Sequence, residues 1–251
     1  MAPVLQGCLK SALGRGWSKQ ELEVQPGLSL LALHRDSSNP RAKRIYISAG
    51  IHGDEPAGPL AVRELLNSDV LPLEHEIWIC PCLNPTGFQN NCRENFEGRD
   101  LNRQYLQPAA REIIAHVGWL EQQPRFDLCL CLHEDWESQG FYVYELNPDR
   151  QTAIAERIIE VVKEVCPIDY SEVIDGRPAC GGIIRPEFQP NLRPDWPEAF
   201  FLLMHKTRLC YTLEAPSDFD LQVRVDALQT AVKACLNSLE EDRSTPAVTA
   251  F

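Results

Sequence analysis

The sequence of 251 residues lacks any run approaching 18 uninterrupted apolar residues, so we expect no transmembrane helix. Its first residues lack the long apolar stretch of a secretory signal, and we therefore expect a cytoplasmic protein. Positive charge is also in deficit, because 24 Lys and Arg residues face 36 Asp and Glu residues, a formal net charge of −12. This acidic balance argues against binding of nucleic acid or of an anionic membrane.

The composition is otherwise that of a globular protein. Hydrophobic residues make up 44% of the chain and charged residues 24%, which excludes a mainly disordered chain and a coiled coil. The length fits one large domain or two small ones. Because no linker divides the sequence, we expect one domain over residues 1–251.

The ten cysteines are too few for a disulfide scaffold in a chain of this length. Several lie in apolar runs, as Cys80 and Cys82 do, and likewise Cys129 and Cys131. In an extended strand, residues i and i+2 lie on one face, which suits the packing of reduced thiols. Metal binding by these pairs is the alternative.

Short apolar runs alternate with segments of helical periodicity. The apolar runs, at residues 44–49, 76–83, 126–132, 141–146 and 209–213, predict buried strands. The periodic segments, at residues 56–67, 108–122, 149–165 and 218–239, predict helices. This alternation predicts an α/β domain with a mostly parallel or mixed sheet.

Three further segments stand apart from this pattern. Residues 20–34, split by Pro26-Gly27, predict a hairpin at the edge of the sheet. Residues 177–197 contain five prolines and three arginines, and a loop this long is either functional or loosely ordered. The tail at residues 242–251 has the composition of a disordered terminus.

The segment from Gly50 to Gly58 carries His52 and Glu55 between a predicted strand and a predicted helix. An imidazole and a carboxylate three residues apart across such a turn can converge on one cation, and zinc accepts this ligand combination. The alternative is a polar turn with Glu55 near the positive end of the helix.

His133 is the candidate for the third ligand, because it ends another predicted strand. Ligands of open α/β sheets bind beyond the carboxyl ends of the strands, which would bring His133 beside His52. A strand-end histidine bonded to a loop is the alternative. The other histidines, which we interpret as structural or surface residues, are His34, His75, His116 and His205.

Two more groups fall at strand ends. The polar segment 84–103 contains Arg93, Arg99 and Arg103, whose guanidinium groups can grip carboxylates and stabilise oxyanions. Composition alone favours a solvated surface loop there. Glu214 ends the last predicted strand, where it either takes a proton from zinc-bound water or is simply solvated. The coincidence of all these groups at strand ends favours a shared site.

Taken in order, the set resembles the active-site series of the zinc carboxypeptidase superfamily. The residues are His52, Glu55, Arg93, Asp100, Leu101, Asn102, Arg103, His133 and Glu214. That superfamily includes the aspartoacylase and succinylglutamate desuccinylase deacylases, and the Arg93 to Arg103 spacing resembles that of bacterial murein-peptide amidases. The resemblance extends over about residues 44–216. It implies a three-layer α/β/α fold in which helices enclose a mixed, largely parallel sheet of eight strands, and a single zinc-peptidase-like catalytic domain.

The resemblance also implies a zinc site with one Zn²⁺ per chain. Its ligands would be His52, Glu55 and His133. Zinc lowers the pKa of a bound water towards about 7 and polarises the substrate carbonyl. Glu214 would act as general base and then as general acid towards the leaving amine. Asp100 would orient a neighbouring ligand or arginine.

The remaining matched residues imply how a substrate is held. Arg93 would polarise the scissile carbonyl, and Asn102 with Arg103 would bind the terminal or α-carboxylate of the substrate. We therefore predict a metallocarboxypeptidase that removes the C-terminal residue of a small peptide. The alternative is an N-acyl-amino-acid deacylase that uses the same groups. Either substrate would carry a free carboxylate.

The sequence leaves several features of such a site open. Residues 177–197 contain Arg177, Arg185 and Arg193, which would assist binding of an acidic substrate if this loop closes over the site. The mobile tyrosine of the digestive carboxypeptidases has no placed counterpart, although Tyr142 and Tyr144 follow His133. The acidic residues 133–138 form either a site for a second cation or a solvated loop.

Two other classes of function fit the sequence less well. A non-catalytic binding protein would be indicated by the loss of a ligand or of the base, and none is lost. A nucleotide binder would need a G-x-x-x-x-G-K-[ST] loop, which the glycines of residues 50–58 do not make.

Overall fold

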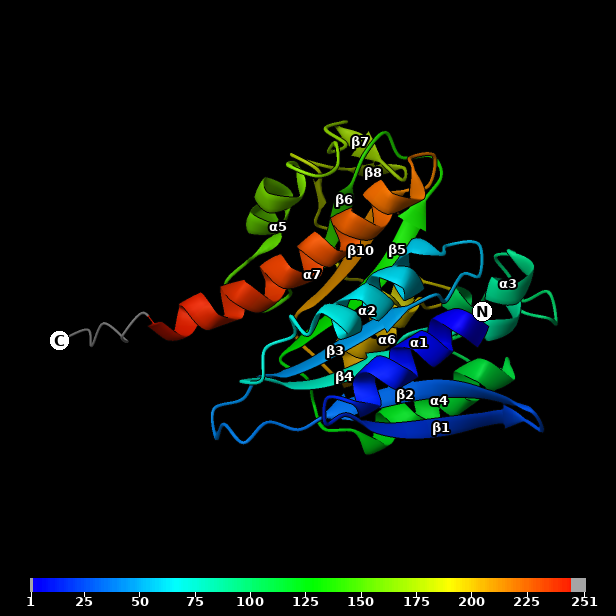
Figure 1. Ribbon diagram of the computed structural model, residues 1–251. Helices are drawn as coiled ribbons and strands as arrows, with labels where there is room; N and C mark the ends of the chain where they lie inside the picture. The colour runs from blue at the N-terminus through cyan, green and yellow to red at the C-terminus, as the bar shows by residue number, and fades with distance from the viewer. Residues whose placement is uncertain (1, 245–251) are drawn as a thin grey trace.

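The computed structural model describes residues 2–244. Within them, the strands of the main sheet are Ser18–Gln25 (β1), Leu28–Arg35 (β2), Arg44–Ala49 (β3), Glu76–Cys80 (β4), Leu128–Asp135 (β5), Tyr142–Leu146 (β6), Ile183–Ile184 (β9) and Cys210–Pro216 (β10). These eight strands lie in the order β1-β2-β4-β3-β5-β10-β6-β9 (Figure 1). The pairs β3–β4, β3–β5, β5–β10 and β6–β9 are parallel, and β1–β2, β2–β4 and β6–β10 are antiparallel.

Helices cover both faces of this sheet. They are Ala2–Leu13 (α1), Ala57–Ser68 (α2), Pro85–Asn90 (α3), Arg111–Gln122 (α4), Ala155–Val162 (α5), Glu198–His205 (α6) and Leu221–Ser244 (α7). Two short 3₁₀ helices, Leu101–Arg103 (η1) and Pro190–Leu192 (η2), and a small hairpin, Val173–Ile174 (β7) with Arg177–Pro178 (β8), complete the described secondary structure.

The two faces follow from the alternation of side chains along each strand. On β3, Ile45 and Ile47 join the core formed with α1, α2, α5 and α7, whereas Tyr46 joins the core formed with α4 and α6. Figure 1 shows α1, α2 and α7 in front of the sheet. The three-layer α/β/α architecture with a mixed, largely parallel sheet is therefore confirmed.

The predicted strands match β3, β4, β5, β6 and β10 with small shifts at their ends. Helix α5 begins only at Ala155, because the preceding residues form a turn. In that turn, Gln151 N–H donates to Asn147 Oδ1 at 2.8 Å, and Asn147 Nδ2 donates to the Gln151 carbonyl at 2.9 Å. Helices α1, α3 and α6 escaped prediction. Residues 199–203 of α6 are apolar on every side, so no helical period is visible.

The segments outside the sheet centre differ more from expectation. β1 and β2 form a hairpin at one edge, with β1 outermost. Residues 177–197 are not a plain loop, because they contain β8, β9 and η2. The predicted disordered tail begins too early, since residues 242–244 belong to α7, and its remainder lies outside the described residues. None of the helices within residues 2–244 combines the length and hydrophobicity needed to cross a bilayer.

The cysteines confirm the interpretation as packed, reduced thiols. All ten are free, and only Cys92 and Cys180 are exposed. Cys129 and Cys131 lie on one face of β5 in the same core as α4 and α6. No cysteine belongs to a cluster of three metal-ligating side chains among residues 2–244.

Candidate metal-dependent active site

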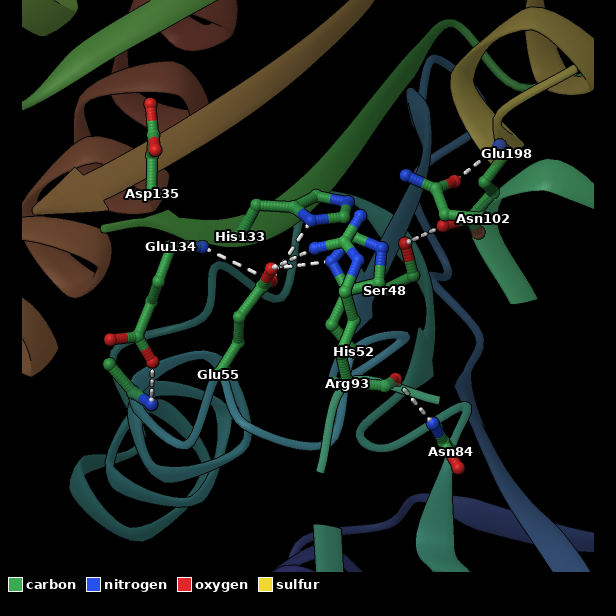
Figure 2. A network of polar contacts seen from close by, with 12 residues as sticks. Ser48, His52, Glu55, Asn84, Arg93, Asn102, His133, Glu134, Asp135 and Glu198 are labelled. Atoms are coloured by element: carbon green, nitrogen blue, oxygen red, sulfur yellow. Dashed lines mark hydrogen bonds and ion pairs between the residues drawn. The ribbon is translucent and has the colours of Figure 1, made fainter. Parts of the chain in front are cut away.

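Three predicted ligands meet at the carboxyl ends of β3 and β5 (Figure 2). Nδ1 of His52 contacts Oε1 of Glu55, and Nδ1 of His133 lies 3.0 Å from Oε2 of the same carboxylate. One ligand atom from each residue lies within 4.8 Å of the others, and all three side chains are buried. The structure thus brings His52, Glu55 and His133 together, as the sequence predicts.

The electrostatics of this group suit a divalent cation. Burial alone would raise the pKa of Glu55, but His52 and His133 outweigh it and lower this pKa to about 2. Burial would likewise lower the pKa of His52, but Glu55 and Asp100 raise it to about 9. A buried carboxylate between two imidazole nitrogens is the donor set that zinc accepts, with a cation replacing the imidazole protons. The residues present therefore fit a bound metal.

Glycines allow the turn that carries His52 to approach its neighbours. Gly50 has a φ of +61°, a conformation that side chains rarely adopt. A Cβ atom added to Gly53 would lie 1.9 Å from the carbonyl carbon of Gly87 in α3. The turn therefore packs directly against the backbone of α3.

Asp100 links the ligand group to Arg93. Its Oδ1 lies 3.4 Å from Nε2 of His52, and its Oδ2 accepts from Nε and Nη2 of Arg93 at 3.2 and 3.0 Å. Nη1 of Arg93 also lies 3.8 Å from Oε1 of Glu55. Burial opposes ionisation of Asp100, but His52 and Arg93 lower its pKa. Asp100 was predicted to orient a ligand or an arginine, and it contacts one of each, His52 and Arg93.

Asn102 and Arg103 lie on η1 and line the same cavity. Oδ1 of Asn102 accepts from the backbone N–H of Glu198 at 2.8 Å. This bond fixes the amide so that its nitrogen faces the metal ligands (Figure 2). An oriented amide donor beside a guanidinium is suited to a carboxylate.

Glu214 stands beside His133 because β10 pairs in register with β5, Glu214 opposite His133. Its partly buried side chain lines the cavity. Burial, with the carboxylates of Glu55, Asp135 and Asp175, raises the pKa of Glu214 to about 8 against the opposing effect of His133. A cation held by the ligand group would favour the ionised form of Glu214, the form that accepts a proton.

The cavity has a volume of about 500 Å³, and its lining includes the metal-ligand candidates, Arg93, Asn102, Arg103 and Glu214. Arg177 and Arg193 line it beside Arg103, and none of these three arginines forms an ion pair with a described carboxylate. Burial lowers the pKa of Arg193, and the charges of Arg177 and Arg103 lower it further, against the opposing charge of Asp195. The guanidinium group of Arg193 lies 4.6 Å from the centre of the Phe200 ring.

Arg185 departs from the prediction that it could assist the substrate. Its Nε and Nη2 lie 2.6 Å from Glu145 and 2.6 Å from Glu156. It lines a neighbouring cavity and not the one with the metal ligands. The alternation of side chains in and after β9 turns Arg185 away from the site.

The acidic residues 133–138 do not form a second cation site within the described structure. Glu134 turns to the opposite face of the sheet from His133 and contacts α2 and α7. Asp135 accepts from the Tyr142 hydroxyl at 2.9 Å. Of the two alternatives that the sequence leaves open for this segment, the second cation site thus finds no cluster of three ligands among the described residues.

The sequence did not place two parts of the site. Tyr142 and Tyr144 line the cavity because β6 pairs with β10, Tyr142 opposite Glu214 and Tyr144 opposite Thr212. Their alternation within a predicted strand was the available signal. Glu198, which holds Asn102, lies in the unpredicted helix α6, and nothing in its sequence context identified it.

A family model described as the succinylglutamate desuccinylase/aspartoacylase catalytic domain matches residues 41–170, just over half of the chain. The chain belongs to this family. It is therefore a hydrolase. The matched residues include the three metal-ligand candidates with Arg93, Asn102 and Arg103, whereas Glu214 lies beyond the match and joins them only through β10. No curated protein matches the sequence.

Solved structures share the fold over most of the chain. A proposed metallopeptidase from Shewanella denitrificans OS217 has a TM-score of 0.81 at 23% identity, covering 94% of this chain and 89% of that one. A metallo-carboxypeptidase from Burkholderia cenocepacia has a TM-score of 0.71 at 18% identity, covering 96% and 68%. The metallo-carboxypeptidase from Pseudomonas aeruginosa, in complex with (2-guanidinoethylmercapto)succinic acid, has a TM-score of 0.68 at 20% identity, covering 94% and 68%. At such identities the likeness establishes the fold.

Proposed function

We propose that this protein is a zinc-dependent, cytoplasmic deacylase that hydrolyses the amide bond of an N-acyl amino acid with a second carboxylate. The observation that carries the substrate class is that Arg103, Arg177 and Arg193 line one cavity and that none of them forms an ion pair with a described carboxylate. Three guanidinium groups repel one another, so a ligand with more than one negative charge would relieve the repulsion. A protein of the same fold is complexed with a substituted succinic acid, which is compatible with such a ligand.

Each residue of the chain has a distinct role in this proposal. His52, Glu55 and His133 would hold the zinc ion, which supplies a Lewis acid for the carbonyl and activates water. Glu214 accepts the proton of the attacking water at its carboxylate and delivers it to the leaving nitrogen. Arg93, 3.8 Å from Glu55, donates to the carbonyl oxygen as negative charge develops there.

The second candidate is the metallocarboxypeptidase that the sequence placed first. Asn102 and Arg103 would then hold the C-terminal carboxylate of a small peptide, and Arg177 with Arg193 an acidic side chain. The same catalytic groups serve both reactions, so only the acyl half of the substrate separates them.

The metal is tested first, by the zinc content of purified protein and of His52→Ala. We expect about one zinc per wild-type chain and none in the variant, because catalytic zinc needs three protein ligands. Glu214→Gln should keep its zinc and lose about 10²–10⁴-fold in kcat. A wild-type protein that neither contains nor takes up zinc would refute the proposal.

The substrate is tested with N-acetyl and N-succinyl derivatives of aspartate, glutamate and leucine, beside dipeptides that end in the same residues. Turnover of the acidic N-acyl amino acids above the leucine derivatives supports the proposal. Turnover of dipeptides alone would establish the carboxypeptidase instead. Arg193→Gln should lower kcat/KM for the acidic substrates about 10–100-fold, since a hydrogen bond to a charged group is worth about 1.5–3 kcal/mol. Arg185→Gln, outside the cavity, is the matched control.

A further inference from the structure

Glu134 is adjacent to the candidate metal ligand His133, yet its side chain faces the opposite side of the sheet. The alternation along β5 places His133 in the cavity and Glu134 between α2 and α7. The Glu134 side chain has no exposed surface. A carboxylate is costly to bury without partners, so its contacts decide what it does there.

The backbone of Glu134 contacts the metal-binding carboxylate directly. Its N–H donates to Oε2 of Glu55 at 3.1 Å, the same oxygen that Nδ1 of His133 contacts (Figure 2). This N–H is therefore one of the groups that hold the Glu55 carboxylate in place, beside His52 and His133.

The side chain of Glu134 fixes the chain that carries Glu55. Its Oε1 accepts from the backbone N–H of Ala57 at 2.5 Å, two residues after Glu55 and at the first residue of α2. The N-cap residue of α2 is Pro56, which provides no side-chain cap. Glu134 thus supplies from β5 the cap that α2 lacks, and it binds the Glu55 segment at both the carboxylate and the following backbone.

Arg224 completes the arrangement from α7. Its Nη1 pairs with Oε2 of Glu134, and the arginine side chain is only 14% exposed. Arg224 lies in the first turn of α7, where a positive charge is unfavourable for the helix dipole. Its pairing with a buried carboxylate offsets that cost, and its charge opposes the effect of burial, which raises the pKa of Glu134.

We propose that Glu134, held by Arg224, is a positioning residue that sets the place of Glu55 and thereby the affinity and geometry of the metal site. This inference rests on the metal site of the proposed function. Glu134 itself is not a ligand, because its carboxylate points away from His52 and His133 (Figure 2). Loss of such supporting contacts typically weakens metal binding about 10–100-fold.

The test compares zinc affinities of metal-stripped wild type, Glu134→Gln and Glu145→Gln, measured by competition with a fluorescent zinc chelator. Glu145 is the matched control, because it is also buried and pairs with an arginine, Arg185 at 2.6 Å, but contacts no metal-ligand candidate. We expect Glu134→Gln to raise the Kd for zinc about 10–100-fold and Glu145→Gln to leave it unchanged. The visible spectrum of the Co²⁺-loaded protein should change in Glu134→Gln alone.

A merely structural role has a different outcome. If Glu134→Gln lowers the Tm of the metal-free protein but keeps the wild-type Kd and Co²⁺ spectrum, the positioning role is refuted while the metal site stands. If Glu134→Gln does not fold, Arg224→Lys is measured by the same criteria, since it keeps the carboxylate and removes the forked guanidinium. A wild-type protein that binds no zinc would overturn the proposed function and this inference together.

Discussion

The two faces of the central sheet are built differently. The face under α1, α2, α5 and α7 is mainly an apolar core, in which the Glu134–Arg224 pair lies between α2 and α7. The face under α4 and α6 contains a buried chain of hydrogen bonds, which runs from Tyr105 through His116 and Tyr46 to Glu198 and Ser48. This polar face is the one to which His133 belongs, so the protein places its hydrogen-bonded core directly beneath the cavity.

The difference teaches how the site keeps its shape. An apolar core tolerates small shifts of one side chain past another, whereas a buried hydrogen-bond chain has one arrangement in which every group is satisfied. Glu198 connects that chain to Asn102 through its backbone N–H. We infer that the apolar face supplies most of the stability, whereas the precision of the site comes from the polar face together with the Glu134–Arg224 pair.

The largest expected effect is the loss of packing on the apolar face. Leu228→Ala, at a fully buried position in α7, should lower the free energy of unfolding by about 2–5 kcal/mol, because a cavity remains. Urea denaturation measures the loss. The zinc affinity of the folded variant should stay that of the wild type, and a parallel loss of zinc would contradict the division between the faces.

A smaller effect is expected from the polar face. The Tyr46 hydroxyl contacts Nε2 of His116 at 2.8 Å and donates to Oε1 of Glu198 at 3.0 Å. Tyr46→Phe leaves both partners short of a hydrogen bond and should cost about 1–3 kcal/mol in urea denaturation. The exposed Tyr170→Phe is the control and should cost nothing measurable. An equal stability of both variants would mean that the chain of hydrogen bonds is dispensable.

The pH dependence of stability tests the same face through His116. Burial lowers the pKa of His116 to about 3, so the folded protein keeps this imidazole neutral while the unfolded chain protonates it below about pH 6.5. The contribution of His116 to the free energy of unfolding is complete above that pH and is lost as the pH falls. At pH 5 the loss is about 2 kcal/mol. Urea denaturation of wild type and His116→Gln between pH 7.5 and 5 measures this loss, because that range spans the pKa of histidine in the unfolded chain. Parallel pH profiles would argue that His116 does not stay neutral.

The smallest effect is the reactivity of thiols in the native protein. Four cysteines of the polar face, Cys80, Cys129, Cys131 and Cys210, are buried. With an aromatic disulfide reagent we therefore expect prompt reaction only at Cys92 and Cys180, and reaction of all ten thiols in denaturant. Prompt labelling of Cys131 would show that this face opens readily.

The sequence by itself determined the architecture and the identity of the metal-ligand candidates. Strands such as 44–49 are continuous apolar runs, and local patterning is enough to find them. His52 and Glu55 share one turn after β3, and His133 lies near the carboxyl end of β5, which is parallel to β3. Their meeting therefore follows from the parallel sheet.

Only the tertiary structure decided the contacts that depend on register and on distant helices. It brought Glu214 beside His133 through β10, turned Arg185 away from the cavity and Arg177 with Arg193 into it, and placed Glu134 against Arg224. Glu134 and Arg224 are 90 positions apart in the sequence, and no local sequence pattern predicts that two such residues meet. The physical reason is that a strand fixes only which of its two faces a side chain takes, while the partner across that face is chosen by how the helices pack.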